Sequence, residues 1–145
     1  MIYTFKSEQF LKTDIDTAWD FFSSAKNLAR ITPPEMAFKI HTQLDEKEVY
    51  YTVKPLLGIP LRWQTEICRV NKPHMFMDRQ LKGPYTLWEH THMFIEKDNG
   101  VLIHDEVKYQ LPLGIFGVIA HSFFVKEKIK KIFKFREKTL NELFK

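Results

Sequence analysis

Two histidines and a nearby acid are the residues of this sequence that could do chemistry. His90 and His92 stand two residues apart within residues 88–94. Trp88 and Phe94, at the two ends of this run, continue the same period of two. Successive side chains of a β-strand point to opposite faces, so this spacing predicts that both imidazoles share one face. Residues 101–111 follow an Asp-Asn-Gly turn and alternate in the same way, with Asp105 on an otherwise apolar face. We therefore expect Asp105 to lie close to both histidines.

A third run mixes polar and apolar side chains in the same manner. Phe76, Asp78 and Gln80 share one face of a predicted strand, which ends before a Gly-Pro pair turns the chain. Three neighbouring strands thus carry polar groups on faces that aromatic and aliphatic residues dominate. Burying an unpaired charge or amide is unfavourable, so these groups must bond one another, water or a ligand. The shared face is therefore expected to line a cavity.

The candidate ligand-binding site combines this face with the inward side of a predicted C-terminal helix. Its members are Phe76, Asp78, Gln80, Trp88, His90, His92, Phe94, Asp105, Tyr109, Ile119 and Phe123. The aromatic and aliphatic members would form the walls, and the polar members would bond the polar end of a lipid-like, isoprenoid or aromatic molecule. A His-Asp network that only fixes the strands is the competing interpretation, and the two are compatible.

Catalysis and metal binding are two further interpretations of the same residues. A histidine tuned by a carboxylate is a general acid or base, so His90, His92 and Asp105 would be the catalytic residues of an enzyme. No nucleophile, oxyanion site or leaving-group acid accompanies them, and the residues favour a binding protein over an enzyme. His-x-His with a nearby carboxylate can supply three zinc ligands, but that spacing alone is a weak signal. We expect no metal and no cofactor.

The elements that hold these strands begin with an opening strand at residues 2–12. Candidate helix N-caps are Thr13, Asp14, Asp16 and Thr17, and the apolar residues from Ile15 onward recur at helical spacing, so a short helix is expected there. A second helix, residues 25–31, ends before a Pro-Pro pair. Further strands are expected at about 36–44, 47–56 and 60–71. With the three strands above they make a curved antiparallel sheet of about seven strands.

A long helix is expected from about residue 115 to residue 144. A mostly apolar stripe follows it at the three-four spacing, through Ile115, Val118, Ile119, Ser122, Phe123, Lys126, Ile129, Ile132, Phe133, Arg136, Leu140 and Leu143. An antiparallel sheet needs one face covered, and this helix is its expected cover. Residues 1–145 are therefore expected to form a single α+β domain, in which the helix and the sheet enclose a cavity.

The positive charge is concentrated at the end of the chain. The net charge is +4, and residues 126–145 alone hold eight Lys or Arg against three Glu. A solvated helical face explains this, and attraction to an anionic membrane surface or an acidic partner is the alternative. No nucleic-acid recognition motif accompanies the charge, so a nucleic-acid partner is not expected.

A lone Cys68 excludes an internal disulfide, and the absence of a signal-peptide pattern favours the cytoplasm.

The motifs around the candidate site resemble those of a known superfamily. They are Phe-x-Asp-x-Gln at 76–80, Gly-Pro-Tyr at 83–85, Trp-x-His-x-His-x-Phe at 88–94, Asp-x-Val-x-Tyr at 105–109 and Leu-Pro-x-Gly at 111–114. The sequence is similar to a bacterial branch of the SRPBCC superfamily with the motif GPYxxWxHxHxF. That superfamily contains START domains, Bet v 1 allergens, polyketide cyclases and coenzyme Q-binding proteins. The order of elements extends the resemblance to the whole chain.

The resemblance implies a helix-grip fold and a hydrophobic cavity, but not a particular ligand, because the superfamily hosts many activities. We expect an apolar or amphipathic small molecule to bind between the sheet and the last helix. An enzyme of the cyclase, dehydratase or hydrolase kind is one alternative. Domains of this branch also occur joined to sugar-nucleotide epimerase-like proteins, so an interaction module that acts on such a partner in trans is another.

Overall fold

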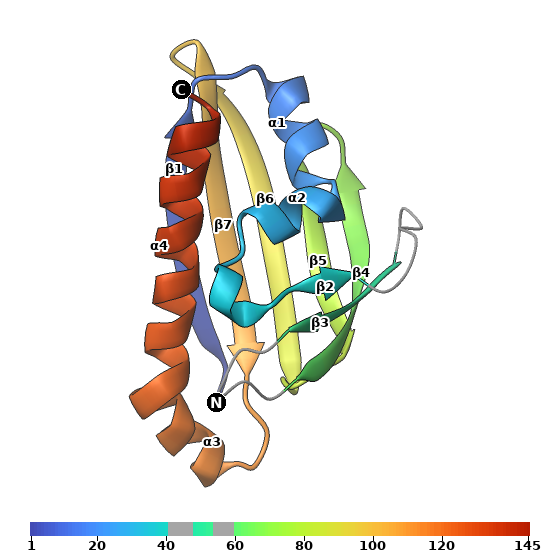
Figure 1. Cartoon of the computed structure of the whole chain (residues 1–145), viewed down its shortest axis with the longest axis vertical. Helices are drawn as coiled ribbons and strands as arrows, with labels where there is room; N and C mark the ends of the chain where they lie inside the picture. Colours follow the sequence, from blue (N-terminus) through green and yellow to red (C-terminus); the bar gives the residue numbers. More distant parts are fainter. Residues whose placement is uncertain (41–47, 54–59) are drawn as a thin grey trace.

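One antiparallel sheet forms the frame of the molecule. The computed structural model describes residues 1–40, 48–53 and 60–145, and Figure 1 shows how their sheet curves around the helices. In this part of the chain the strands are β1 (Tyr3–Leu11), β2 (Lys39–Ile40), β3 (Glu48–Val53), β4 (Leu61–Asn71), β5 (Met75–Lys82), β6 (Leu87–Lys97) and β7 (Gly100–Gln110). Their order across the sheet is β1-β7-β6-β5-β4-β3-β2. The first strand therefore pairs with the last, and the others follow as a meander.

The expected α+β helix-grip fold is confirmed. Six strands have six residues or more, and β2 is a two-residue edge strand. The parts of the expected strands that fall at residues 41–47 and 54–56 lie outside the described residues. The Asp-Asn-Gly hairpin is present, because Asp98 and Asn99 both adopt positive φ, +50° and +61°, as the tightest two-residue hairpin turn requires. This turn sets the register in which β6 faces β7.

Helices occur at both ends of the chain. They are α1 (Ile15–Phe22), α2 (Ala25–Arg30), the 3-10 turn η1 (Pro34–Met36), α3 (Ile115–Ala120), the π-helical turn η2 (His121–Val125) and α4 (Lys126–Leu143). Of the candidate N-caps, Asp14 is the one that caps α1, and its carboxylate accepts from the backbone N–H of Thr17 at 2.8 Å. No helix in the described part of the chain is long and apolar enough to span a membrane.

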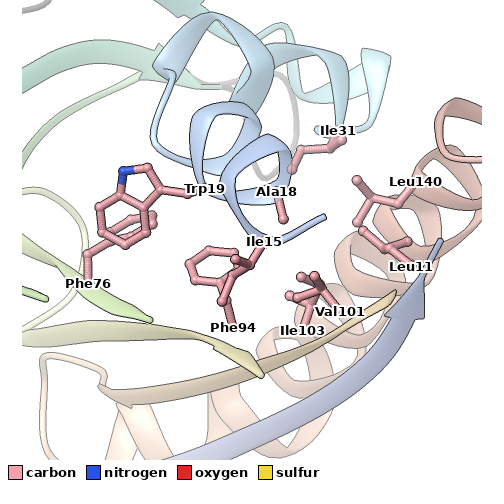
Figure 2. Close-up of a cluster of buried hydrophobic side chains, with 10 residues drawn as sticks. All are labelled: Leu11, Ile15, Ala18, Trp19, Ile31, Phe76, Phe94, Val101, Ile103 and Leu140. Atoms are coloured by element: carbon pink, nitrogen blue, oxygen red, sulfur yellow. The ribbon is translucent and has the colours of Figure 1, made fainter. Parts of the chain in front are cut away.

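The helices cover the concave side of the sheet in two places. Figure 1 shows α4 running beside β1, while α1 lies across β6 and β7 near the C-terminal end of α4. In the close-up of Figure 2, Trp19 of α1 sits between Phe76 and Phe94, with ring centroids 5.4 and 5.8 Å away. Leu140 of α4 closes the same apolar cluster. This end of the molecule is therefore solidly packed.

The C-terminal helix changes its geometry partway along. The expected helix over 115–144 is continuous, but the π-helical turn η2 separates α3 from α4. In α4 the expected stripe is buried at Ile129, Phe133, Arg136 and Leu140. In α3 the stripe is not buried, since 71% of Ile115 is exposed. A π turn takes more residues than an α turn, so the three-four spacing of an uninterrupted α-helix does not place residues before and after η2 on one face.

Candidate functional site

Two histidines and two aspartates form a quartet on the concave face of the sheet, in which His90, His92 and Asp105 are buried and Asp78 is half-buried. His90 Nε2 lies 2.7 Å from Asp105 Oδ1, and His92 Nε2 lies 2.5 Å from Asp78 Oδ2. These bonds run diagonally, because the directly opposed pairs are Asp78 with His90 and His92 with Asp105. The two imidazole rings stack with centroids 3.7 Å apart. The quartet therefore joins β5, β6 and β7 across their shared face.

The protonation state of the quartet follows from burial and from its own charges. Burial alone would raise the pKa of Asp105, but the hydrogen bond with His90 and the neighbouring imidazoles outweigh it, and the pKa is about 2. The pKa of Asp78 is lowered as well. Burial would raise it, but His90 and the hydrogen bond with His92 outweigh burial. Burial and the adjacent His90 lower the pKa of His92. At neutral pH both carboxylates are ionised and His92 is neutral, so its Nε2–H donates to Asp78.

A cavity of about 470 Å³ lies between this quartet and the helices. Its floor comes from β3 to β6, and its walls come from α2, η1, η2 and α4. Among the described residues, its lining is Leu28, Thr32, Met36, Phe38, Tyr51, Val53, Leu61, Trp63, Asp78, Pro84, Tyr85, Trp88, His90, His92, Leu111, Phe123, Phe124, Val125, Glu127, Lys128, Ile129, Lys131, Ile132, Phe133 and Arg136. The volume falls within the range of cavities that hold one drug-sized molecule, about 300 to 1,000 Å³.

The cavity has an aromatic side and a polar side. On the aromatic side Trp63 stacks on Tyr51 at 5.7 Å and meets Trp88 edge-on at 5.3 Å. On the polar side His90 and His92 project from β6, and Arg136 of α4 lies over the ring of Phe133 at 4.8 Å. An amphipathic molecule would find both an apolar surface and hydrogen-bonding groups here.

Five of the residues predicted from sequence line the cavity. They are Asp78, Trp88, His90, His92 and Phe123. Asp105 lies next to them, bonded to His90, but is not part of the lining. The strand faces expected from the period of two are thus present, and they bring the His-Asp residues together.

The other predicted residues serve different contacts in this structure. Phe76 and Phe94 belong to the packed cluster around Trp19. The Gln80 side chain holds the β5–β6 turn, donating to the carbonyl of Tyr85 at 2.6 Å and accepting from its N–H at 3.1 Å. The remaining two predicted residues, Tyr109 and Ile119, do not line the cavity either. The hydroxyl of Tyr109 bonds the His121 imidazole at 2.7 Å, and Ile119 is half exposed.

Sequence reasoning missed the groups that complete the cavity, chiefly Trp63 and Arg136. Trp63 stands on β4 at the same alternation as Thr65 and Ile67, a pattern that predicts a strand but not a cavity wall. Arg136 stands within the predicted helix stripe, one turn from Phe133 and Leu140. A basic residue that stands between apolar residues of the stripe, one turn from each, was the signal that could have identified it.

The quartet has some of the composition of a metal site. Asp78, His90 and His92 can each offer one ligand atom, and these atoms lie within 4.8 Å of one another. In this structure, however, both Nε2 atoms are engaged with carboxylates. The arrangement is that of a hydrogen-bonded network.

Comparisons with known proteins identify the fold. No protein-family model matches the sequence, and no curated protein matches it significantly. A START superfamily protein from Mycobacterium smegmatis superposes with a TM-score of 0.71 at 13% identity, over 98% of both chains. The Zhui aromatase/cyclase from Streptomyces sp. R1128 gives a TM-score of 0.75 at 11% identity, over 97% of this chain and 92% of that one.

A third similar structure is a nucleoside-diphosphate sugar epimerase from Corynebacterium glutamicum. It gives a TM-score of 0.68 at 22% identity over 95% of this chain, which corresponds to 28% of the epimerase chain. At these identities the likeness establishes the fold and not the activity. The chain has the helix-grip fold of START and aromatase/cyclase domains, as the resemblance to the SRPBCC superfamily implied.

Proposed function

We propose that this domain binds one apolar or amphipathic small molecule, of the lipid, isoprenoid or aromatic class, in the cavity between the sheet and α4. One observation carries the proposal: the cavity is large enough for such a ligand and is mostly apolar, with its polar groups gathered beside β6 and α4. Stability alone would favour filling this space, because empty volume in a core is destabilising. The opposite end of the sheet, around Trp19, is filled in that way.

The first test is native mass spectrometry of the purified protein, followed by organic extraction of any copurified molecule. In parallel, the neutral dye N-phenyl-1-naphthylamine reports cavity binding by its fluorescence. We expect Ile132→Trp, which fills the cavity from α4, to abolish dye binding, whereas Leu143→Trp on the same helix but outside the cavity leaves it intact. Equal dye binding by the two variants, or none by the wild type, would exclude the cavity as the site.

A cyclase-like enzyme is the second candidate function. The observation that favours it is the position of His90 and His92 on the cavity wall, where each is paired with a carboxylate. A substrate bound there would meet imidazoles able to move protons. When the wild-type protein is added to a polyketide-forming system, we expect the product profile to change. The His92→Gln variant should not cause this change, although it should still bind the dye. An unchanged profile with wild-type protein would remove this candidate for that substrate class.

An interaction module is the third candidate, and the epimerase structure is the observation that favours it. The epimerase chain contains a domain of this fold. We expect a partner in trans, of the sugar-nucleotide epimerase class, to copurify with the chain or to bind it in a titration. Absence of binding to a panel of such enzymes would count against this role.

A further inference from the structure

Among the described residues, the buried side-chain nitrogen and oxygen atoms that lack a hydrogen-bond partner all belong to residues of the cavity wall. In the part of the chain that the structure describes, these atoms are Trp63 Nε1, His92 Nδ1, Arg136 Nε and Arg136 Nη1. His92 Nδ1 lies 3.5 Å from Asp105 Oδ1, inside the quartet. In the neutral His92 this atom is an acceptor, so the N–H donors left for a ligand are those of Trp63 and Arg136. A ligand that satisfies them must bring oxygen acceptors.

Arg136 is a buried charge without a direct counter-ion. The residue is 7% exposed, and among the described residues no carboxylate forms an ion pair with it. Arg136 is close enough to help lower the pKa of Asp78 and of Asp105, but each of these carboxylates accepts a hydrogen bond from a histidine instead. A guanidinium held in this way, with two nitrogen atoms unpaired, is unfavourable unless an anion or polar acceptor completes it.

The charges around the cavity indicate what kind of acceptor fits. The helix α4 contributes Lys128, Lys131 and Arg136 to the lining, while its Glu127 is paired with Lys130 at 3.4 Å. The helix side is therefore positive and suits an anion. Asp78 on the opposite wall is ionised and would repel a second negative charge. A singly charged head group is thus favoured over a doubly charged phosphate.

We propose that the cavity takes an amphiphile with a single carboxylate head group, which pairs with Arg136 while the apolar body of the molecule lies against the aromatic wall. This inference rests on the proposed binding function and adds the chemistry of the head group. A guanidinium presents its donors in a planar fork that matches the two oxygens of a carboxylate. Trp63 Nε1 supplies a further donor to any oxygen along the body.

The test compares two ligands that differ only in the head group. Dodecanoic acid and dodecan-1-ol compete against N-phenyl-1-naphthylamine at about pH 8, where a free carboxyl is ionised. We expect the acid to displace the dye from wild-type protein at a concentration about 10- to 100-fold lower than the alcohol, the range for a hydrogen bond to a charged group. Arg136→Met should remove this preference, and Lys134→Met, an exposed lysine of the same helix, should keep it.

Each outcome separates the head-group inference from the binding function. If the dye binds but acid and alcohol displace it equally from wild-type protein, the carboxylate inference is wrong and the cavity function stands. If neither the dye nor either competitor binds, the binding function itself fails. A preference that survives in Arg136→Met would also overturn the role of Arg136. If Arg136→Met does not fold, Arg136→Lys replaces it. The comparison of acid and alcohol on wild-type protein also still decides, because it needs no substitution.

Discussion

The hydrogen bond between His90 and Asp105 is buried on both sides, with side chains only 5% and 7% exposed. Removing the carboxylate by Asp105→Ala leaves the Nε2–H of His90 without its acceptor. We expect a loss of about 1 to 3 kcal/mol in the free energy of unfolding, the cost of an unsatisfied buried donor. Urea denaturation followed by circular dichroism measures it.

The adjacent Glu106 provides a matched control for that substitution. It projects from the opposite face of β7 and lies 3.6 Å from Lys6, whose side chain is 63% exposed. Glu106→Ala should cost less than about 1 kcal/mol, because exposed ion pairs contribute little. Losses of the same size in the two variants would mean that the quartet is not a special source of stability.

Residue spacing predicted the strand faces but not the pairing within the quartet. The period of two placed His90, His92 and Asp105 together because alternation is a property of a single strand. The diagonal bonds depend on the register between strands, on the twist and on side-chain rotamers, none of which is local. Arg136 was missed as a site residue for the same reason. Its burial depends on where α4 lies on the sheet.

At the scale of elements, the segment that leads from β7 into α4 exposes an unusual amount of apolar surface. Its large exposed residues are Leu113, Ile115, Phe116, Ile119, Phe123 and Phe124, each at least half exposed. The lysine-rich first turns of α4 follow at once in the sequence. An apolar segment flanked by cations is typical of a surface that rests on an anionic membrane.

We expect the protein to sediment with vesicles that contain phosphatidylserine and not with neutral phosphatidylcholine vesicles. The binding should weaken as salt is added, because the lysine contribution is screened. The double substitution Leu113→Ser and Phe116→Ser, at residues that do not line the cavity, should also reduce binding to the phosphatidylserine vesicles. Ile95→Ser, an exposed apolar residue on β6, is the control. Binding that is independent of lipid charge, or that survives the double substitution, would contradict this prediction.

The same segment shows why element boundaries were easier to predict than element faces. The helix from about 115 to 144 was expected, and only its geometry differs. Its apolar residues were assigned to one stripe, because an uninterrupted α-helix was assumed. The π-helical turn at His121–Val125 breaks that register, which leaves Ile119 half exposed and outside the cavity. The apolar spacing of the sequence does not signal such a turn.

At the scale of the whole molecule, the concave side of the sheet is divided between a packed end and a hollow end. One end is filled by Trp19, Phe76, Phe94 and their neighbours, and the other is left hollow beside Trp63 and Tyr51. The His-Asp quartet lies between the two, since Phe76 stacks on His92 at 4.3 Å and His90 meets Phe133 at 5.7 Å. The quartet therefore couples the fold's stability to the ionisation of groups at the cavity wall.

That coupling predicts a stability that falls steadily on acidification. The pKa of Asp105 is about 2 in the folded protein against an ordinary 3.8, so its stabilisation is present above about pH 5. It is lost as the pH falls through the folded pKa, and the shift corresponds to about 2 kcal/mol. The lowered pKa of Asp78 acts in the same direction. The pKa of His92 is also below its ordinary 6.5. Below about pH 6.5 the unfolded chain therefore takes up a proton at this imidazole more readily than the folded protein does, and stability falls.

Urea unfolding at a series of pH values between about 7 and 3 measures this dependence, since the midpoint concentration follows the free energy of unfolding. We expect the wild-type midpoint to fall through the whole range, first as His92 takes up a proton and then as the carboxylates do. Asp105→Asn removes one titrating carboxyl while keeping its shape, so its midpoint should fall less steeply below about pH 5. An identical slope in that variant, or a midpoint that rises on acidification, would show that the quartet does not govern acid stability.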